Sequence, residues 1–176
     1  TANIASICRN LGIKLVYIST DYVFDGKKGN YTELDKTNPL GAYAQTKLDG
    51  EKTIKKLNGH LIIRTSIYGW NIQKKQSFVE WVISNLREGK DINVITDQRT
   101  SIIFVNNLAK ILKLMLDKNL KGIYNAASRN SLTRYELALK TADIFGLNKT
   151  LIKPTTTEGL MKKVVWKAER PKNILS

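Results

Sequence analysis

The chain has 176 residues, 42% hydrophobic and 25% charged, which is long enough and apolar enough for a folded domain with a core. It contains no run of about 18 apolar residues and no basic segment followed by an apolar run at its start, so it predicts neither a transmembrane helix nor a signal peptide. One cysteine, Cys8, excludes an internal disulfide and suits a reducing cytoplasm. With one histidine, His60, we expect no zinc site and no other metal site.

Basic residues outnumber acidic residues by 29 to 15, a formal charge of +14. Such a charge suits an anionic partner, which is nucleic acid, a membrane surface or a phosphorylated small molecule. The lysines occur as scattered pairs, without a single basic tract and without aromatic residues between them to stack on bases, so we expect no nucleic-acid partner. A diphosphate-bearing substrate needs only a few of these charges.

The first third of the chain alternates between helix and strand patterns. Apolar residues at helical spacing over 4–11 predict a helix that ends at Gly12. Residues 15–18 predict a short buried strand, and the polar, glycine-rich stretch over 21–41 predicts a loop long enough to suggest a function. Residues 42–57 predict a helix with its lysines facing outward.

The alternation continues to residue 146. Residues 61–65 form an apolar strand of the type found in a parallel sheet that is covered on both faces. Ser77-Phe-Val-Glu80 and Thr133-Arg-Tyr-Glu136 have the spacing of capping boxes and predict the start of two helices. Further elements are strands over 92–95 and 123–125, a helix over 106–116, and an irregular tail after Pro154.

This order of elements predicts an α/β fold that is part of a Rossmann-like, doubly wound parallel sheet. Only the strands at 15–18 and 61–65 are strongly of the parallel type, and a complete sheet of this kind has more. No glycine-rich turn that could cradle a dinucleotide phosphate follows any strand. Either the domain is small and unusual, or its first strands are lacking.

Two side chains of the helix that begins at Ala42 form a candidate acid–base pair. Tyr43 and Lys47 are four residues apart, so they share one helix face with Cβ atoms about 6 Å apart. An ammonium group stabilises a phenolate, so such a pair can act in general acid–base catalysis. Alone the signal is weak, because Tyr-x-x-x-Lys occurs by chance in many helices and a bare pair of this kind is more often a solvated contact.

The segment 18–26 gives this pair its context. It follows the first strand, and in parallel α/β sheets ligands bind beyond the carboxyl ends of the strands. The hydroxyl and carboxylate groups of Ser19, Thr20 and Asp21 are therefore well placed to hydrogen-bond a substrate. The alternative is that these side chains only cap turns in the loop.

Together these motifs closely resemble the dTDP-4-dehydrorhamnose reductase family of extended short-chain dehydrogenases. The resemblance begins with Ser-Thr-Asp-Tyr-Val-Phe-Asp-Gly at 19–26 and spans nearly the whole chain in the family's order. The further motifs are Tyr31-x-Glu33, Pro39-Leu40, Tyr43-x-x-x-Lys47-Leu48, Gly50-Glu51, Arg64-Thr65-Ser66-Ile67-Tyr68-Gly69, Asp97-Gln98, Asn107-Leu108-Ala109, Gly122-Ile123-Tyr124 and Arg170-Pro171.

The resemblance implies reduction of the 4-keto group of a nucleotide-linked 6-deoxyhexose by NADPH or NADH, with dTDP-4-dehydrorhamnose converted to dTDP-rhamnose. Tyr43 matches the tyrosine that protonates the new hydroxyl and that also contacts the cofactor. Lys47 matches the lysine that binds the nicotinamide ribose and assists the tyrosine, and Ser66 matches a cofactor-binding position. Thr20 matches the hydroxyl that holds the carbonyl oxygen.

Asp21 and Ile67 match substrate-binding positions of the family. The family commonly has a tryptophan at the position of Ile67, and the aliphatic side chain leaves the identity of the sugar nucleotide open. Trp70 lies three residues further on and is an alternative aromatic contact, although a merely packed or exposed tryptophan explains it as well.

The family pattern also divides the chain. Residues 1–70 match the later part of the dinucleotide-binding domain, and residues 71–176 match mainly a smaller substrate-binding domain with segments that return to the sheet. The family's glycine-rich turn has no counterpart here, so the chain as given should bind dinucleotide poorly unless a preceding segment completes it. Arg99 and Arg170 are candidates to face the diphosphate, and surface salt bridges are the equal alternative for each.

Two other functions stay open. The family includes the regulatory beta subunit of methionine adenosyltransferase, a binding partner that looks like a reductase, and the superfamily includes epimerases and dehydratases that share Tyr43 and Lys47. Retention of Thr20 with this pair favours catalysis, and the run at 19–26 favours the reductases. We expect a nucleotide-sugar substrate, no membrane partner, and a homodimer as one possible assembly.

Overall fold

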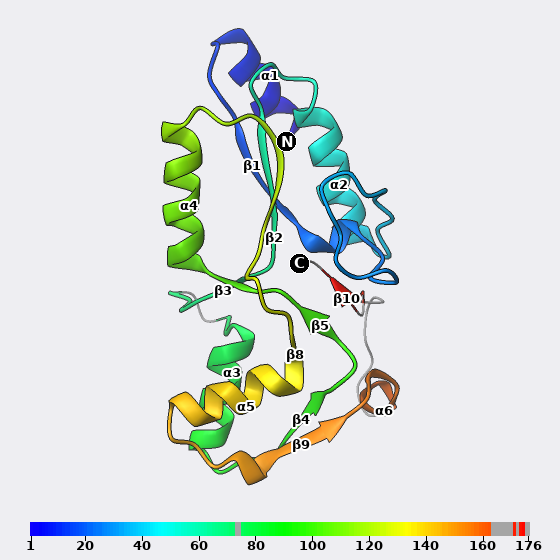
Figure 1. Cartoon of the computed structure of the whole chain (residues 1–176), viewed down its shortest axis with the longest axis vertical. Helices are drawn as coiled ribbons and strands as arrows, with labels where there is room; N and C mark the ends of the chain where they lie inside the picture. The colour runs from blue at the N-terminus through cyan, green and yellow to red at the C-terminus, as the bar shows by residue number, and fades with distance from the viewer. Residues whose placement is uncertain (73–74, 163–170, 172, 175–176) are drawn as a thin grey trace.

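The computed structural model describes residues 1–72, 75–162, 171 and 173–174, and Figure 1 traces them along the chain. The elements in order are α1 (Ala2–Asn10), β1 (Val16–Thr20), the 3-10 turn η1 (Asp21–Val23), α2 (Ala42–Ile54), β2 (Leu61–Thr65), β3 (Ile67–Tyr68), α3 (Phe78–Arg87), β4 (Ile92–Ile95), β5 (Arg99–Thr100), β6 (Ile103–Phe104), α4 (Val105–Asp117), β7 (Gly122–Ala126), β8 (Leu132–Thr133), α5 (Arg134–Ile144), η2 (Lys149–Leu151), β9 (Ile152–Thr155), α6 (Thr157–Met161) and β10 (Asn173–Ile174).

A parallel three-stranded sheet in the order β1-β2-β7 is the framework of the fold. Its strands are in register, so that Thr20 lies beside Thr65 and Thr65 beside Ala126. All three carboxyl ends therefore meet at one edge. Among the described residues β1 pairs only with β2, which leaves its other edge open.

Helices cover both faces of this sheet, with α1 and α2 on one side and α4 on the other (Figure 1). The alternation of side chains along β2 explains the two cores. Ile62 packs with residues of α1 and α2, whereas Leu61 and Ile63 pack with Leu108 and Met115 of α4. All five residues of β2 are buried, as expected for a central parallel strand. The predicted α/β fold with a Rossmann-like parallel sheet is confirmed.

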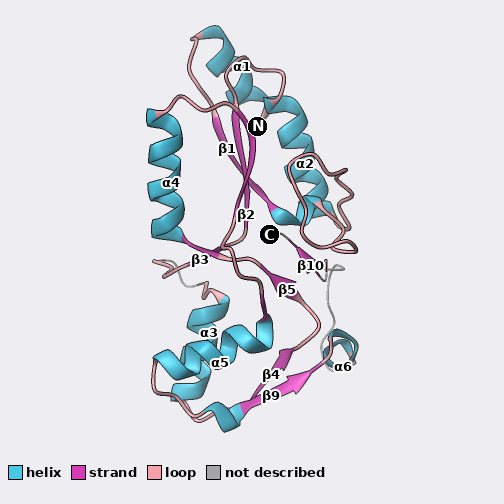
Figure 2. Ribbon diagram, in the orientation of Figure 1, coloured by secondary structure: helices cyan, strands magenta, loops and turns pink. Residues whose placement is uncertain are grey.

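The lower part of the molecule in Figure 2 is built from α3, α5 and short strands. There α3 and α5 pack on β4 and β9, which pair in parallel, and enclose a second core around Val82 and Ala138. Both predicted capping boxes are present, with Ser77 bonded to the Glu80 backbone and Thr133 to the Glu136 backbone.

Two features differ from the sequence-based expectations. The short strands β3, β5, β6 and β8 were not predicted, because two residues carry no periodic pattern. The tail after Pro154 was predicted to be irregular, and this is wrong for its first part: Pro154 lies within the edge strand β9, and α6 follows with Thr156 as its side-chain cap. The division into 1–70 and 71–176 stays a prediction, and β7 of the second segment joins the sheet of the first.

Gly50 permits α2 to approach β1 closely. A Cβ atom at this position would lie 2.6 Å from Cζ of Tyr17. The Tyr17 ring cannot easily withdraw, because its hydroxyl donates to the Lys47 carbonyl (3.3 Å) and the Lys47 ammonium lies 4.5 Å from its centroid.

Gly50→Ala is therefore expected to lower the free energy of unfolding by about 1–2 kcal/mol, because the overpacking cost exceeds alanine's gain in helix propensity. Urea denaturation measures this, with exposed Lys52→Ala on the same helix as the control. Unchanged or increased stability of the Gly50 variant would show that the contact does not constrain α2.

Candidate functional site

The candidate site lies at the carboxyl edge of the parallel sheet, where β1 runs directly into the turn η1. Thr20 is the cap of this turn: its Oγ1 accepts a hydrogen bond from the Tyr22 backbone N–H (3.2 Å). The same hydroxyl donates to Oδ1 of Asp21 (3.1 Å). The capping role and the expected placement of polar groups at the edge are thus both observed.

Asp21 is an unusual carboxylic acid because it is only 1% exposed and its Oδ2 atom is buried without a hydrogen-bond partner. Burial raises its pKa to about 6, and the hydrogen bond from Thr20 and the positive charge of Arg134 oppose that rise. Buried carboxyl groups with raised pKa values are concentrated at functional sites.

Tyr43 and Lys47 come from the first two turns of α2, on the side next to β1. Tyr43 is 61% exposed, and its ring meets that of Tyr22 edge-on with centroids 6.5 Å apart. The Lys47 ammonium donates to the Ile18 carbonyl oxygen at 2.5 Å, near the end of β1. The structure therefore brings Lys47 to the strand that carries Thr20, and places the phenol of Tyr43 beside the turn that follows it.

A buried ion pair fixes α2 to the sheet. Both oxygens of Glu51 accept from Arg64 of β2, Oε1 from Nε at 3.0 Å and Oε2 from Nη2 at 2.8 Å. Ser19 of β1 donates to the same carboxylate at 2.6 Å. The side chains of Glu51 and Arg64 are 0% and 2% exposed. Glu51 lies one helical turn beyond Lys47, so this cluster anchors the helix that carries the acid–base pair.

The remaining predicted site residues lie beyond the end of β2. Ser66 is half-buried, and its carbonyl accepts from the Ile103 N–H at 2.9 Å. Ile67 is 45% exposed on β3, which pairs with β6 and not with the sheet that carries Thr20. Trp70 is 59% exposed and meets Phe145 edge-on at 6.0 Å.

Arg99 forms the surface interactions that were the alternative to a diphosphate contact. Its guanidinium donates to the Ser131 carbonyl at 2.9 Å and pairs with Glu136 at 3.4 Å, with both side chains more than 40% exposed. Arg170, the other candidate, lies outside the described residues.

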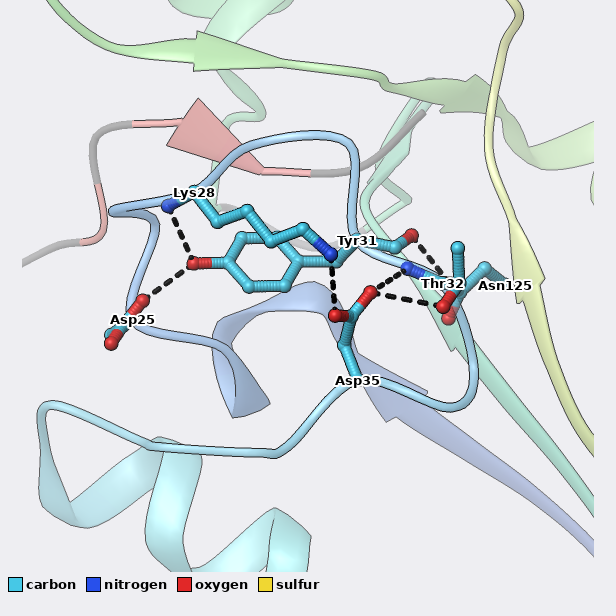
Figure 3. Close-up of polar contacts among 6 residues, drawn as sticks. All are labelled: Asp25, Lys28, Tyr31, Thr32, Asp35 and Asn125. Carbon is cyan, nitrogen blue, oxygen red and sulfur yellow. Dashed lines mark hydrogen bonds and ion pairs between the residues drawn. The ribbon is translucent and has the colours of Figure 1, made fainter.

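The long loop over 21–41 is ordered by its own polar contacts (Figure 3). The Tyr31 hydroxyl donates to Asp25 at 2.5 Å and accepts from the Lys28 N–H at 3.0 Å. The Lys28 ammonium pairs with Asp35, and the Asn125 amide of β7 donates to the Tyr31 carbonyl at 3.0 Å. The hydrogen bond from Tyr31 is the main reason that the pKa of Asp25 falls to about 2. These contacts tie the loop beside the site to the far strand of the sheet.

Two residues linked to the site were not predicted as site residues. Arg134 at the start of α5 acts on Asp21 by its charge and lies 5.0 Å from the Phe78 ring. The Nε2 atom of Gln98 is buried without a partner, and the Gln98 carbonyl accepts from the Arg134 N–H at 3.2 Å. The capping box at Thr133 predicted the start of α5, but no sequence signal indicated that Arg134 of this helix would act on Asp21.

Within the described ranges, no group of three or more His, Cys, Asp or Glu side chains could hold a metal ion. No helix in the part of the chain that the structure describes is long and apolar enough to cross a membrane.

Glu51→Gln is expected to lower the free energy of unfolding by about 3–5 kcal/mol, because it leaves the charge of Arg64 buried without its counter-ion. Urea denaturation measures the loss. The double variant Glu51→Leu with Arg64→Met should recover most of it, since no charge then remains buried. The matched control is Glu88→Gln, whose exposed pair with Lys90 contributes less than about 1 kcal/mol. Equal losses of unfolding free energy in Glu51→Gln and Glu88→Gln would contradict the anchoring role.

The raised pKa of Asp21 predicts a pH-dependent stability. The folded state binds this proton more tightly than the unfolded state, in which the pKa is near 3.8. Stability should therefore fall by up to about 3 kcal/mol as pH rises from about 4 to about 6, and should then level off. Asp21→Asn is expected to remove this fall and to be the more stable protein at pH 7.5. Thermal unfolding across pH tests this, with exposed Asp117→Asn as the control that keeps the fall.

Comparisons with known proteins show the family of the chain. The sequence model described as the RmlD substrate binding domain matches residues 1–175. The beta subunit of methionine adenosyltransferase 2 from Rattus norvegicus is 33% identical over 98% of this chain, which spans 53% of that protein. The probable low-salt glycan biosynthesis reductase of Haloferax volcanii is 31% identical over 90% of the chain and 54% of its own length.

A solved structure extends the likeness to three dimensions. The dTDP-4-dehydrorhamnose reductase of Bacillus anthracis, solved in complex with NADP, matches 99% of this chain with a TM-score of 0.90 and 31% identity. The match covers 61% of that protein, so the chain spans about half to three-fifths of its relatives. The resemblance seen in the motifs is confirmed, and the chain belongs to the RmlD substrate binding domain family.

Proposed function

We propose that the protein containing this chain reduces the 4-keto group of a nucleotide-activated 6-deoxyhexose, with dTDP-4-dehydrorhamnose as substrate and dTDP-rhamnose as product. One observation carries the proposal: the Lys47 ammonium is held against the end of β1, on a helix whose preceding turn presents the Tyr43 phenol beside the turn capped by Thr20. In a member of this family, that arrangement supports proton delivery to a carbonyl oxygen.

The cofactor of this reaction is NADPH or NADH, which supplies the hydride. The groups at the carboxyl edge fit the nicotinamide end of such a molecule, because the Lys47 ammonium and the hydroxyls of Tyr43 and Ser66 are donors suited to ribose and amide oxygens. Support also comes from the Bacillus anthracis relative, whose structure was solved with NADP. No residue described here is assigned to the adenosine end.

The chain's own side chains have separate tasks in this proposal. Tyr43 gives its phenolic proton to the oxygen that becomes the new hydroxyl, and Thr20 holds that oxygen by a hydrogen bond. Lys47 orients the ribose and stabilises the phenolate left after proton transfer. Asp21 belongs to the substrate site as the buried neighbour of Thr20, and Ile67 contacts the sugar from the strand that follows the sheet edge. A homodimer remains part of the proposal, supported by the apolar Ile4 and Ile7 exposed on α1.

Tyr43→Phe is expected to reduce kcat by about 10²-fold or more, because it removes the positioned acid. Lys47→Ala should both lower kcat and raise KM for NADPH. The assay is NADPH oxidation by the intact protein with dTDP-4-dehydrorhamnose. The matched controls are Tyr135→Phe in α5 and exposed Lys52→Ala in α2, which should retain wild-type kinetics. A fully active Tyr43→Phe enzyme would refute the role of the phenol, and unchanged kinetics of Lys47→Ala would refute that of the ammonium.

A second candidate function is that of a regulatory subunit without turnover. It is supported by the rat relative, a subunit of methionine adenosyltransferase 2 with 33% identity. Sedimentation of the intact protein with a methionine adenosyltransferase catalytic subunit, alongside the reductase assay, separates the two. Reduction without complex formation supports the enzyme, whereas a tight complex without reduction supports the regulatory function.

A further inference from the structure

The hydrogen bonds of the Thr20 hydroxyl limit what it can offer a substrate. A hydroxyl has one proton to donate and two lone pairs that accept. Here one lone pair accepts from the Tyr22 N–H at 3.2 Å, and the proton is donated to Asp21 at 3.1 Å. While Asp21 is ionised, the proton of Thr20 is therefore already engaged, and only a lone pair remains for a ligand.

A neutral Asp21 changes which hydrogen bonds the Thr20 hydroxyl can still offer. Its own carboxyl proton can then be donated to the second lone pair of Thr20, which fills both acceptor sites and frees the Thr20 proton. A carbonyl oxygen only accepts hydrogen bonds, so a ketone needs the freed proton. An alcohol can donate to the remaining lone pair of Thr20 beside an ionised Asp21. The neutral state of Asp21 thus suits the ketone substrate of a carbonyl reduction, and the ionised state suits its alcohol product.

The surroundings of Asp21 make the neutral state accessible. The side chain is 1% exposed, and its Oδ2 has no partner that would stabilise a negative charge. Among the described residues, the Arg134 side chain of α5 acts on Asp21 by its positive charge, and its guanidinium also lies over the Phe78 ring. The charged groups of α2 on this side are engaged elsewhere, Lys47 with the Ile18 carbonyl and Glu51 with Arg64.

We propose that Asp21 is a positioning residue that sets the direction of the Thr20 hydroxyl, holding its proton when ionised and releasing it toward a substrate carbonyl oxygen when neutral. The proposal rests on the proposed reduction and adds to it a residue that acts through Thr20. The change from the ionised to the neutral state takes up one proton from solvent, which binds to the carboxyl group. The Thr20 proton stays on its own oxygen and only changes direction.

The hydrogen bond itself is tested without any turnover. Carboxyl ¹³C NMR of protein labelled at aspartate gives the titration midpoint of Asp21, assigned by the signal that Asp21→Asn removes. We expect a midpoint near 6 in the wild type. A higher midpoint is expected in Thr20→Val, which keeps the shape of the side chain but lacks the hydroxyl that stabilises the ionised carboxylate. Thr20→Ser should keep the wild-type midpoint. Equal midpoints in wild type and Thr20→Val, or a wild-type midpoint near 3.8, would overturn the proposal.

The consequence for catalysis is tested by kcat/KM for the ketosugar in the intact protein. The neutral fraction of a group with a pKa of about 6 falls roughly 25-fold between pH 5.5 and 7.5, and the wild-type kcat/KM should fall in proportion. Asp21→Asn, which cannot ionise, should flatten this part of the profile, while the remote control Asp117→Asn should keep it. A wild-type fall that persists in Asp21→Asn would overturn the proposal.

Failure of the proposed reductase function can be distinguished from failure of the proposed role of Asp21. If the intact protein reduces no nucleotide ketosugar, the proposed function fails and the role toward a substrate carbonyl fails with it, while the NMR titrations still decide whether Asp21 and Thr20 share a proton. If reduction occurs and the Asp21→Asn profile matches the wild type, only the positioning role fails.

Discussion

The buried ion pair between Glu51 and Arg64 is the constraint on which the candidate site depends. It joins the middle of α2 to the central strand β2, and Ser19 extends it to β1. Because two charges are removed from water here, neither partner can shift without a large free-energy cost. The same helix face carries Lys47 and Tyr43 one and two turns earlier, so the position of the acid–base pair at the sheet edge follows from this anchor.

Unpaired buried polar atoms lie both in the anchor and at the edge of the sheet beside it. Nη1 of Arg64 and Oδ2 of Asp21 are each buried without a hydrogen-bond partner among the described residues. Unpaired buried polar groups reduce stability, and proteins tend to keep them where a ligand completes the hydrogen bonding. The unpaired carboxyl oxygen of Asp21, at the carboxyl end of β1, is the feature expected of a site that binds a polar, hydroxyl-bearing substrate.

Local patterns made most of the fold predictable. The periodic apolar residues of α2, the continuous apolar run of β2 and the two capping boxes needed only neighbouring residues to be interpreted. The motifs also predicted Thr20, Tyr43 and Lys47 as site residues, and a strand end followed by the next helix carries all three. The pairing of Glu51 with Arg64 and the approach of Arg134 to Asp21 could not be predicted, because each joins distant segments that only the folded sheet brings together. The strand β9 was missed because a proline argues against a central strand. Pro154 is tolerated here because β9 is an edge strand.

The central claim is that the intact protein reduces the 4-keto group of the sugar nucleotide, and the most direct test of it follows a labelled hydride from the cofactor. The intact protein is incubated with dTDP-4-dehydrorhamnose and NADPH that carries deuterium at both hydrogen positions of nicotinamide C4, and the sugar product is analysed by mass spectrometry and NMR. A reductase of the proposed kind places one deuterium at C4 of the hexose, in equal amount to the NADP formed. A product without deuterium, or deuterium that stays on the cofactor while the sugar is epimerised or dehydrated, would contradict the account.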